Sequence, residues 1–325
     1  MLDKSDRLQT LAPWLGKRFG LDEEEIALLD RTAYLCKADL ATSLVIEMTS
    51  LQGTMGREYA RISGEKPRVA TAIAEHYMPR SAGDSVPSGV LATVLAIADR
   101  VDSLAGLFTV GMAPTGSADP YGLRRAAAGV VQILLEKQID LPLEEVVAKA
   151  LDLLPVTAAD GVLDRVMGFI TGRLEGALRD MGLAYDVVAA ALAERGDNPL
   201  LALRVAQQLS TWIARDDWSL LLDNYARCVR ITRDRPSFDL VPDALVEDEE
   251  KTLYEALLQA EAVGASDVDA LLTAFAPMIT AIQSFFDKVL VMAKDEGLRA
   301  ARLALLQRVA GLAVGIADLS QLEGF

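Results

Sequence analysis

The feature that most constrains the fold of this chain is its supply of helix-forming residues. Ala and Leu dominate the sequence, and runs of β-branched residues are short, which favours helix over sheet. Pro, Gly and Asn interrupt the helical spacing and mark where helices end. We find no convincing strand in any region. The sequence therefore predicts an all-α fold.

Helical spacing is continuous over several stretches of the first 140 residues. Asp22 is placed as an N-cap, and three glutamates follow it at the positive end of a helix dipole. We expect helices over residues 26–48, 55–62, 67–77, 90–108 and 121–138. The last of these would have Asp119 as its N-cap and Pro120 at its first helical position.

The 325 residues are enough for two or three cores, and the sequence divides into three regions. An amino-terminal helical domain would cover residues 1–140, and a helical middle region residues 141–236. Residues 237–325 would form a carboxy-terminal helical bundle. This bundle opens with an acidic segment at 239–250 and ends with two long helices, at 278–293 and 296–317.

The net charge of −15 argues against non-specific binding of nucleic acid, because attraction to phosphate is the main source of such affinity. The charge is uneven along the chain. Residues 1–140 hold 15 Lys and Arg against 18 Asp and Glu, whereas residues 141–325 hold 17 against 29. A local basic face is therefore compatible with the overall charge.

Cys36 and Cys228 have neither metal-site nor disulfide-framework spacing, which is typical of a protein in a reducing compartment. The amino terminus lacks the pattern of a secretion signal. The longest apolar-rich run, residues 89–98, is about half the length of a membrane-spanning helix. We expect a soluble, cytoplasmic protein that does not bind membranes.

Six short phrases in one order carry a family resemblance. They are Lys37-Ala38-Asp39-Leu40, Leu51-Gln52-Gly53-Thr54-Met55-Gly56, Glu75-His76-Tyr77-Met78-Pro79-Arg80, Ala98-Asp99-Arg100-Val101-Asp102, the phrase at 114–120 and Leu123-Arg124-Arg125-Ala126-Ala127. Together they resemble the HD-like domain of the bacterial glycyl-tRNA synthetase β subunit. Residues 285–292 and 298–306 resemble the DALR-type anticodon-binding domain of the same subunit.

This resemblance implies a carboxy-terminal part of a longer β subunit, and a role in binding tRNA(Gly), including its anticodon arm, during glycyl-tRNA synthesis. It implies a separate α subunit as the protein partner, which activates glycine with ATP and Mg. The chain itself would hold no cofactor, no aminoacylation site and no catalytic residue, and it would not bind DNA. Its sequence has neither a P-loop nor a persuasive Ser-His-Asp or Cys-His arrangement.

The resemblance places Asp39, His76 and Asp99 at the metal site of an HD-type hydrolase. Such enzymes hold their metal with several histidines and aspartates. His76 is the only histidine of this chain, and Ala38 stands where an HD enzyme would have another. We expect a degenerate, buried, hydrogen-bonded cluster without metal. A metal-dependent phosphohydrolase is the alternative, and an assembly module that binds protein through its acidic surface is a second.

Six arginines are candidates for contact with tRNA: Arg124, Arg125, Arg227, Arg230, Arg299 and Arg302. Arg124 and Arg125 lie at a helix start beside a Gly-rich loop, where they could bind phosphate or pair with Asp99 or Asp102. One of the two is expected to face inward and the other outward.

The cluster containing Arg227 and Arg230 could bind RNA or pair with the acidic segment 239–250. Arg302 falls on an apolar stripe of the last helix and is expected to be partly buried, with Asp287 as a candidate partner. Arg299 lies off that stripe and is more available to RNA. Phe285 and Phe286 are more typical of core positions than of base-stacking platforms.

Overall fold

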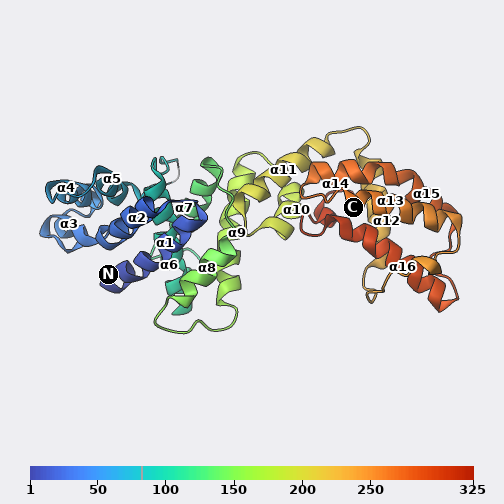
Figure 1. Cartoon of the computed structure of the whole chain (residues 1–325), viewed down its shortest axis with the longest axis horizontal. Coiled ribbons are helices and arrows are strands. Elements are labelled where there is room, and N and C mark those ends of the chain that lie inside the picture. Colours follow the sequence, from blue (N-terminus) through green and yellow to red (C-terminus); the bar gives the residue numbers. More distant parts are fainter. Residues whose placement is uncertain (82) are drawn as a thin grey trace. The chain divides into compact units, whose positions relative to one another are not determined.

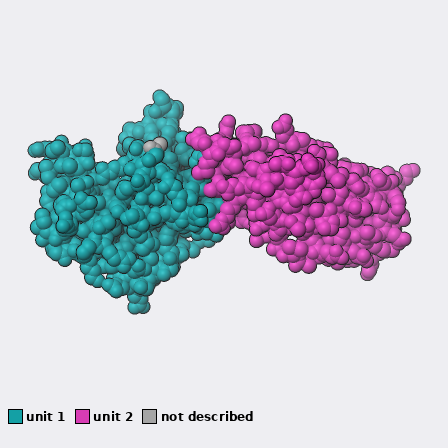
Figure 2. All heavy atoms as spheres, turned by 90° about the horizontal axis from the view of Figure 1, so that it is seen from above, with its two compact units in different colours: residues 1–177, 197–200 teal, residues 178–196, 201–325 magenta. Residues whose placement is uncertain are grey.

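The computed structural model describes residues 1–81 and 83–325, and its helices form two compact units (Figures 1 and 2). Unit 1 comprises residues 1–177 and 197–200, and unit 2 comprises residues 178–196 and 201–325. The described residues contain no β-strand, only an isolated bridge between Thr115 and Ala118. The predicted all-α fold is confirmed. The division into regions 1–140, 141–236 and 237–325 rests on the sequence and stays a prediction.

Unit 1 is built around α6 (Val90–Thr109), which packs against α1, α2, α5, α7 and α8. Most of its residues are buried, so it is apolar on nearly all sides, as a central core helix must be. The surrounding helices are α1 (Leu2–Arg18), α2 (Glu23–Leu35), α3 (Ser43–Glu47), α4 (Thr54–Ile62), α5 (Pro67–Glu75), α7 (Leu123–Glu136), α8 (Leu143–Asp152) and the first part of α9 (Val162–Asp180).

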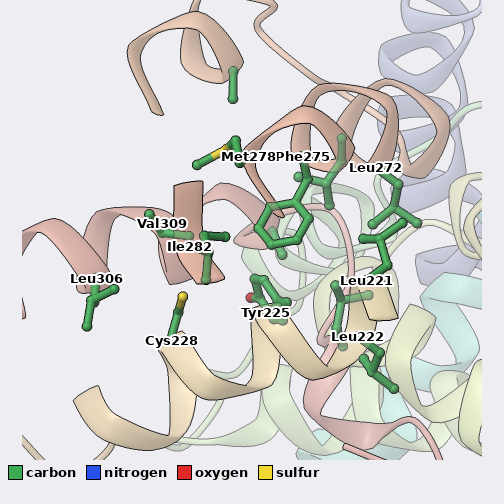
Figure 3. Close-up of a cluster of buried hydrophobic side chains, with 14 of the residues drawn as sticks. Leu221, Leu222, Tyr225, Cys228, Leu272, Phe275, Met278, Ile282, Leu306 and Val309 are labelled. Carbon is green, nitrogen blue, oxygen red and sulfur yellow. The ribbon is translucent and has the colours of Figure 1, made fainter. Parts of the chain in front are cut away.

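Unit 2 has a core in which α12 (Trp218–Thr232) packs against α15 (Ile279–Lys288) and α16 (Glu296–Ala310). Figure 3 shows side chains of this core, including Tyr225, Phe275 and Ile282. Tyr225 donates a hydrogen bond to the backbone oxygen of Ala310 at 2.8 Å, which ties α12 to the end of α16. The remaining helices are α10 (Tyr185–Arg195), most of α11 (Pro199–Ile213), α13 (Asp248–Ala262) and α14 (Val268–Phe275).

One helical stretch, Val268–Lys288, is long and apolar enough to cross a membrane by length and composition. It is longer than the apolar run at 89–98, which the sequence predicts to be the longest. It consists of α14, a short 3-10 turn and α15, and it is partly buried inside the protein. Phe275, Met278 and Ile282 from this stretch belong to the core of unit 2, and that role accounts for its apolar character (Figure 3).

Several predicted helices are confirmed to within two residues, namely those over 55–62, 67–77 and 90–108. Asp22 is the predicted N-cap, and its carboxylate accepts the backbone N–H of Glu25 at 2.8 Å. The predicted continuous helix over 26–48 is wrong. Helix α2 ends at Leu35, because the next residues turn so that Lys37 and Asp39 point into the protein, and α3 starts only at Ser43.

The predicted helix over 121–138 is also found to within two residues, but its predicted N-cap Asp119 and first helical position Pro120 are wrong. Gly122 has φ +67°, and α7 begins after it at Leu123. The Asp119 carboxylate still caps this helix, since it accepts the backbone N–H groups of Leu123 and Arg124 at 2.8 and 2.9 Å. Near the carboxy terminus, the predicted helices over 278–293 and 296–317 are shorter, ending at Lys288 and Ala310.

Candidate functional site

A buried lysine occupies the centre of the predicted HD cluster. Lys37 Nζ lies 2.8 Å from His76 Nε2 and 2.9 Å from a carboxylate oxygen of Asp99. Its ammonium also lies 4.2 Å from the centre of the Tyr77 ring. Lys37 stands directly before the Ala38-Asp39 pair in the sequence, but the sequence analysis did not select it. A residue beside a buried pair is usually apolar. The charge of Lys37 at this position was therefore the sequence signal that could have identified it.

The hydrogen bonds of His76 determine which of its nitrogens carries the proton. Nδ1 lies 2.8 Å from the backbone oxygen of Ile73, which can only accept, so Nδ1 donates. Nε2 must then accept from the Lys37 ammonium. Burial lowers the pKa of His76 well below its ordinary value, and the neighbouring Lys37 lowers it further. His76 is therefore a neutral side chain that serves as an acceptor.

Asp99 supplies the negative charge of this cluster. Its carboxylate lies 3.0 Å from Lys4 Nζ and 2.9 Å from Lys37 Nζ. Burial raises the pKa of Asp99, but Lys37 and Lys4 outweigh that effect, and the pKa lies well below its usual range. Asp102 is one helical turn further along α6 and pairs with Lys4 and Arg7.

Asp39 is separate from this cluster in the structure. Its Oδ2 accepts the backbone N–H groups of Gly53 and Gly56, at 2.6 and 3.2 Å, and so holds the turn before α4. In the part of the chain that the structure describes, no three His, Cys, Asp or Glu side chains are grouped to hold a metal ion. His76 and Asp99 do face a common point, but the ammonium group of Lys37 already lies between them. These residues do not fit a hydrolytic metal centre.

Arg124 and Arg125 differ in their environment, but neither pairs with Asp99 or Asp102. Arg124 is half-buried and donates to the backbone oxygen of Gly116, so it holds the loop before α7. Arg125 is exposed and has no hydrogen bond or ion pair among the residues described. The two aspartates are taken instead by Lys4, Arg7 and Lys37.

Helix α12 carries Arg227 and Arg230 on its exposed side, away from the core residues Tyr225 and Cys228. The Arg227 guanidinium lies 4.3 Å from the centre of the Phe286 ring, and Arg230 lies 5.4 Å from that of Phe325. Both distances are within the range of cation–π attraction.

The alternative in which this arginine cluster pairs with the acidic segment 239–250 is wrong. Over the described ranges 1–81 and 83–325, no ion pair joins the two. Two acids at the end of this segment pair with other cations, since Glu249 pairs with Lys288 at 2.7 Å and Glu250 pairs with Arg302. Among the residues that the structure describes, no carboxylate forms an ion pair with Arg227 or Arg230.

Arg302 is buried, as expected, but its partner is Glu250 rather than Asp287. Glu250 is fully buried and also accepts the backbone N–H groups of Val246 and Glu247, at 2.6 and 2.9 Å. Arg302 donates a further hydrogen bond to the backbone oxygen of Leu290 at 2.9 Å. The Arg302 guanidinium is thus bound to partners inside unit 2.

Arg299 is half-exposed and pairs with Glu296 on its own helix at 3.3 Å. Phe285 is a core residue, fully buried, whereas Phe286 is partly exposed beneath Arg227. The apolar face of the last helix is broad in the structure, because residues 301–306 are all buried. Contact of any of these arginines with tRNA stays a prediction.

Comparisons with known proteins agree with the resemblance in the sequence. A family model described as the glycyl-tRNA synthetase beta subunit matches residues 1–193, and one described as the DALR anticodon binding domain matches residues 221–316. The second match begins at residue 221 and so includes nearly all of α12.

Curated relatives match almost the whole chain. The glycine–tRNA ligase beta subunit of Moorella thermoacetica is 40% identical over 99% of this chain and 48% of its own length. Those of Aeromonas hydrophila and Halalkalibacterium halodurans are 40% and 35% identical, over 98% of this chain and 47% and 48% of their own lengths. The chain spans about half the length of the curated relatives it matches. It belongs to the glycyl-tRNA synthetase beta subunit family and carries a DALR anticodon-binding domain.

Proposed function

We propose that this chain is the carboxy-terminal, tRNA-binding part of a glycine–tRNA ligase β subunit, and that unit 2 binds the anticodon arm of tRNA(Gly). One observation carries this proposal. The DALR match falls on unit 2, where α12 presents Arg227 and Arg230 as exposed cations that form no ion pair with any carboxylate of the described residues.

The geometry suits the way proteins recognise single-stranded RNA. Anticodon bases are read when they are splayed out and stacked on aromatic rings or guanidinium planes. Arg227 over Phe286 and Arg230 over Phe325 provide two such flat groups on one face. Arg299 is a further candidate contact at half exposure, whereas Arg302 supports the fold from inside.

The chemistry of glycine activation belongs, in this proposal, to the α subunit, which would use ATP and Mg. Both subunits would work in the cytoplasm. The arrangement of Lys37, His76 and Asp99 supports a binding role for unit 1 rather than hydrolysis, because the ammonium takes the position that an HD metal would need.

Binding of the chain to three RNAs tests the proposal: tRNA(Gly), the same tRNA with a substituted anticodon, and an unrelated tRNA, each at low and high salt. We expect the tightest binding to native tRNA(Gly), weakened by salt because phosphate contacts release counterions. The double variant R227Q/R230Q should lose at least tenfold in affinity.

Arg204 provides the matched control for that variant. It is an exposed arginine on α11 in unit 2, outside the α12 face, and R204Q removes a charge of the same kind. Equal losses for R204Q and for each single α12 variant would show a general charge effect and contradict the assignment. If the chain binds none of the three tRNAs, the alternative of an assembly module is favoured. Such a module would bind protein through its acidic surface, which agrees with the net charge of −15.

A further inference from the structure

Unit 1 contains a cavity of about 530 Å³ beside the Lys37 cluster. The amino-terminal part of α1, the residues after α2, the segment after α5, and parts of α6 and α7 surround it. Its charged lining is strongly one-sided, with five cations and one carboxylate: Lys4, Lys37, Arg80, Arg100, Arg125 and Asp99. In a chain of net charge −15, such a concentration of positive charge requires an explanation.

The single carboxylate cannot neutralise this lining. Asp99 is shared between Lys4 and Lys37, and the nearby Asp102 is shared between Lys4 and Arg7. Three cations of the cavity, Arg80, Arg100 and Arg125, have no carboxylate within ion-pair distance in the described part of the chain. The side chains that line the cavity therefore carry a net positive charge.

Arg100 supplies a fixed charge at the wall of the cavity. It is 8% exposed, and its two terminal nitrogens donate to four backbone oxygens, those of His76, Tyr77, Pro79 and Ala96, each at 3.0 Å. These bonds hold the guanidinium in place, but carbonyl dipoles leave its full charge uncancelled. Arg100 attracts an anion without offering it a free N–H on those two nitrogens.

Arg80 and Arg125 provide the free donors. Both side chains are exposed at the rim. Arg80 donates one hydrogen bond to the backbone oxygen of Gln52 at 3.0 Å, and Asp84 accepts only its backbone N–H. Arg125 makes no hydrogen bond within the described ranges. Two guanidinium groups with free N–H donors thus flank the mouth of the cavity, and the cavity wall carries further positive charge.

We propose that this cavity is a phosphate-binding site. A phosphate group has the negative charge and the several acceptor oxygens that two guanidinium groups can engage together. The cavity volume is within the range of small-ligand sites, so a phosphate with an attached group fits. Under the proposed function, a phosphate of tRNA is the occupant, and only this choice of source rests on that function.

The experiment measures binding of two probes, inorganic pyrophosphate by calorimetry and tRNA(Gly) by filter binding, to the whole chain. Three proteins are compared: the wild type, R80Q/R125Q, and R165Q. Arg165 is an exposed arginine of α9 in unit 1 that lies outside the cavity. Both substituted arginines of the rim are exposed, so the double variant should melt at the wild-type temperature.

We expect R80Q/R125Q to weaken pyrophosphate binding at least tenfold, and R165Q to change it less than twofold. A parallel loss of tRNA affinity, with pyrophosphate competing against tRNA, supports a tRNA phosphate as the occupant. Loss of pyrophosphate binding with unchanged tRNA binding supports the site with a small phosphorylated ligand instead.

Two results separate failure of this site from failure of the proposed function. Pyrophosphate binding that is absent, or equal in all three proteins, overturns the site whatever tRNA does. Pyrophosphate binding that depends on the rim arginines in a chain without any tRNA affinity upholds the site and contradicts the tRNA-binding function.

Discussion

The buried ion pair between Glu250 and Arg302 permits a quantitative test of how unit 2 is held together. Glu250 lies in the first turn of α13 and Arg302 in the middle of α16, and both are at most 5% exposed. In E250Q the carboxylate charge is lost, but its shape and one acceptor oxygen remain. Arg302 then keeps only its bond to Leu290 and a distant carboxylate, Glu247 at 3.9 Å.

Leaving one member of a buried pair without its partner costs about 3–5 kcal/mol. We expect E250Q to lie near the lower end, about 3 kcal/mol, because the amide oxygen can still accept one of the two backbone N–H groups. Replacing both members, as in E250Q/R302M, leaves no unpaired charge. The double variant should therefore be more stable than the sum of the two single effects predicts.

The assay is urea unfolding followed by tryptophan fluorescence in a W14F background. Trp212 and Trp218 then remain, and both belong to the core of unit 2, so the signal reports this unit alone. E249Q is the matched control, because Glu249 is the neighbouring residue but pairs with Lys288 at the surface. If E250Q shifts the midpoint no more than E249Q does, or if the double variant is additive, the reasoning is refuted.

Three further predictions concern unit 1 and the cysteines. Burial and Lys37 keep His76 neutral in the folded state, with a pKa below the unfolded value of 6.5. The free energy of unfolding should therefore be highest above pH 6.5 and fall by up to about 1.4 kcal/mol per pH unit below it. Urea unfolding at pH 7.0 and 5.5 should show this slope in the wild type and a smaller one in H76Q. Gly53 and Gly64 both have positive φ, but a Cβ on Gly53 would lie 2.7 Å from an aromatic ring while one on Gly64 meets open space; G53A should therefore lower Tm more than G64A, and equal shifts would contradict the contact. Burial raises the pKa of both Cys36 and Cys228 to about 12, so a thiol reagent at pH 8 should label neither in the folded chain and both after denaturation.

Local signals in the sequence predicted the local structure well. Asp22 marked a helix start because an N-cap acts within its own first turn, and the apolar run at 90–108 marked the central helix because a helix buried on nearly all sides is apolar over most of its surface. The break after Leu35 was missed because it depends on Asp39 reaching the backbone of Gly53, which helical spacing around Asp39 does not reveal.

Partners distant in the sequence were the main source of error at the candidate sites. Spacing placed Arg302 on a buried face, but it could not choose between Asp287 and Glu250, which lies 52 residues away. Likewise, the acidic segment at 239–250 seemed a natural partner for Arg227 because it is adjacent in sequence. In the fold it pairs with Arg302 and Lys288 instead, and neighbours along a chain of helices need not be neighbours in space.

The ammonium of Lys37 has a consequence for the conditions under which unit 1 can fold. A cluster of this kind, with His76 and Asp99 turned toward one point, needs a positive charge at its centre. A metal ion would have to be captured from the surroundings and could be removed by a chelator. Lys37 is encoded with the chain and is delivered at every synthesis, so the cluster is complete as soon as the helices meet. The folding of unit 1 should therefore be indifferent to the metal supply of the cell.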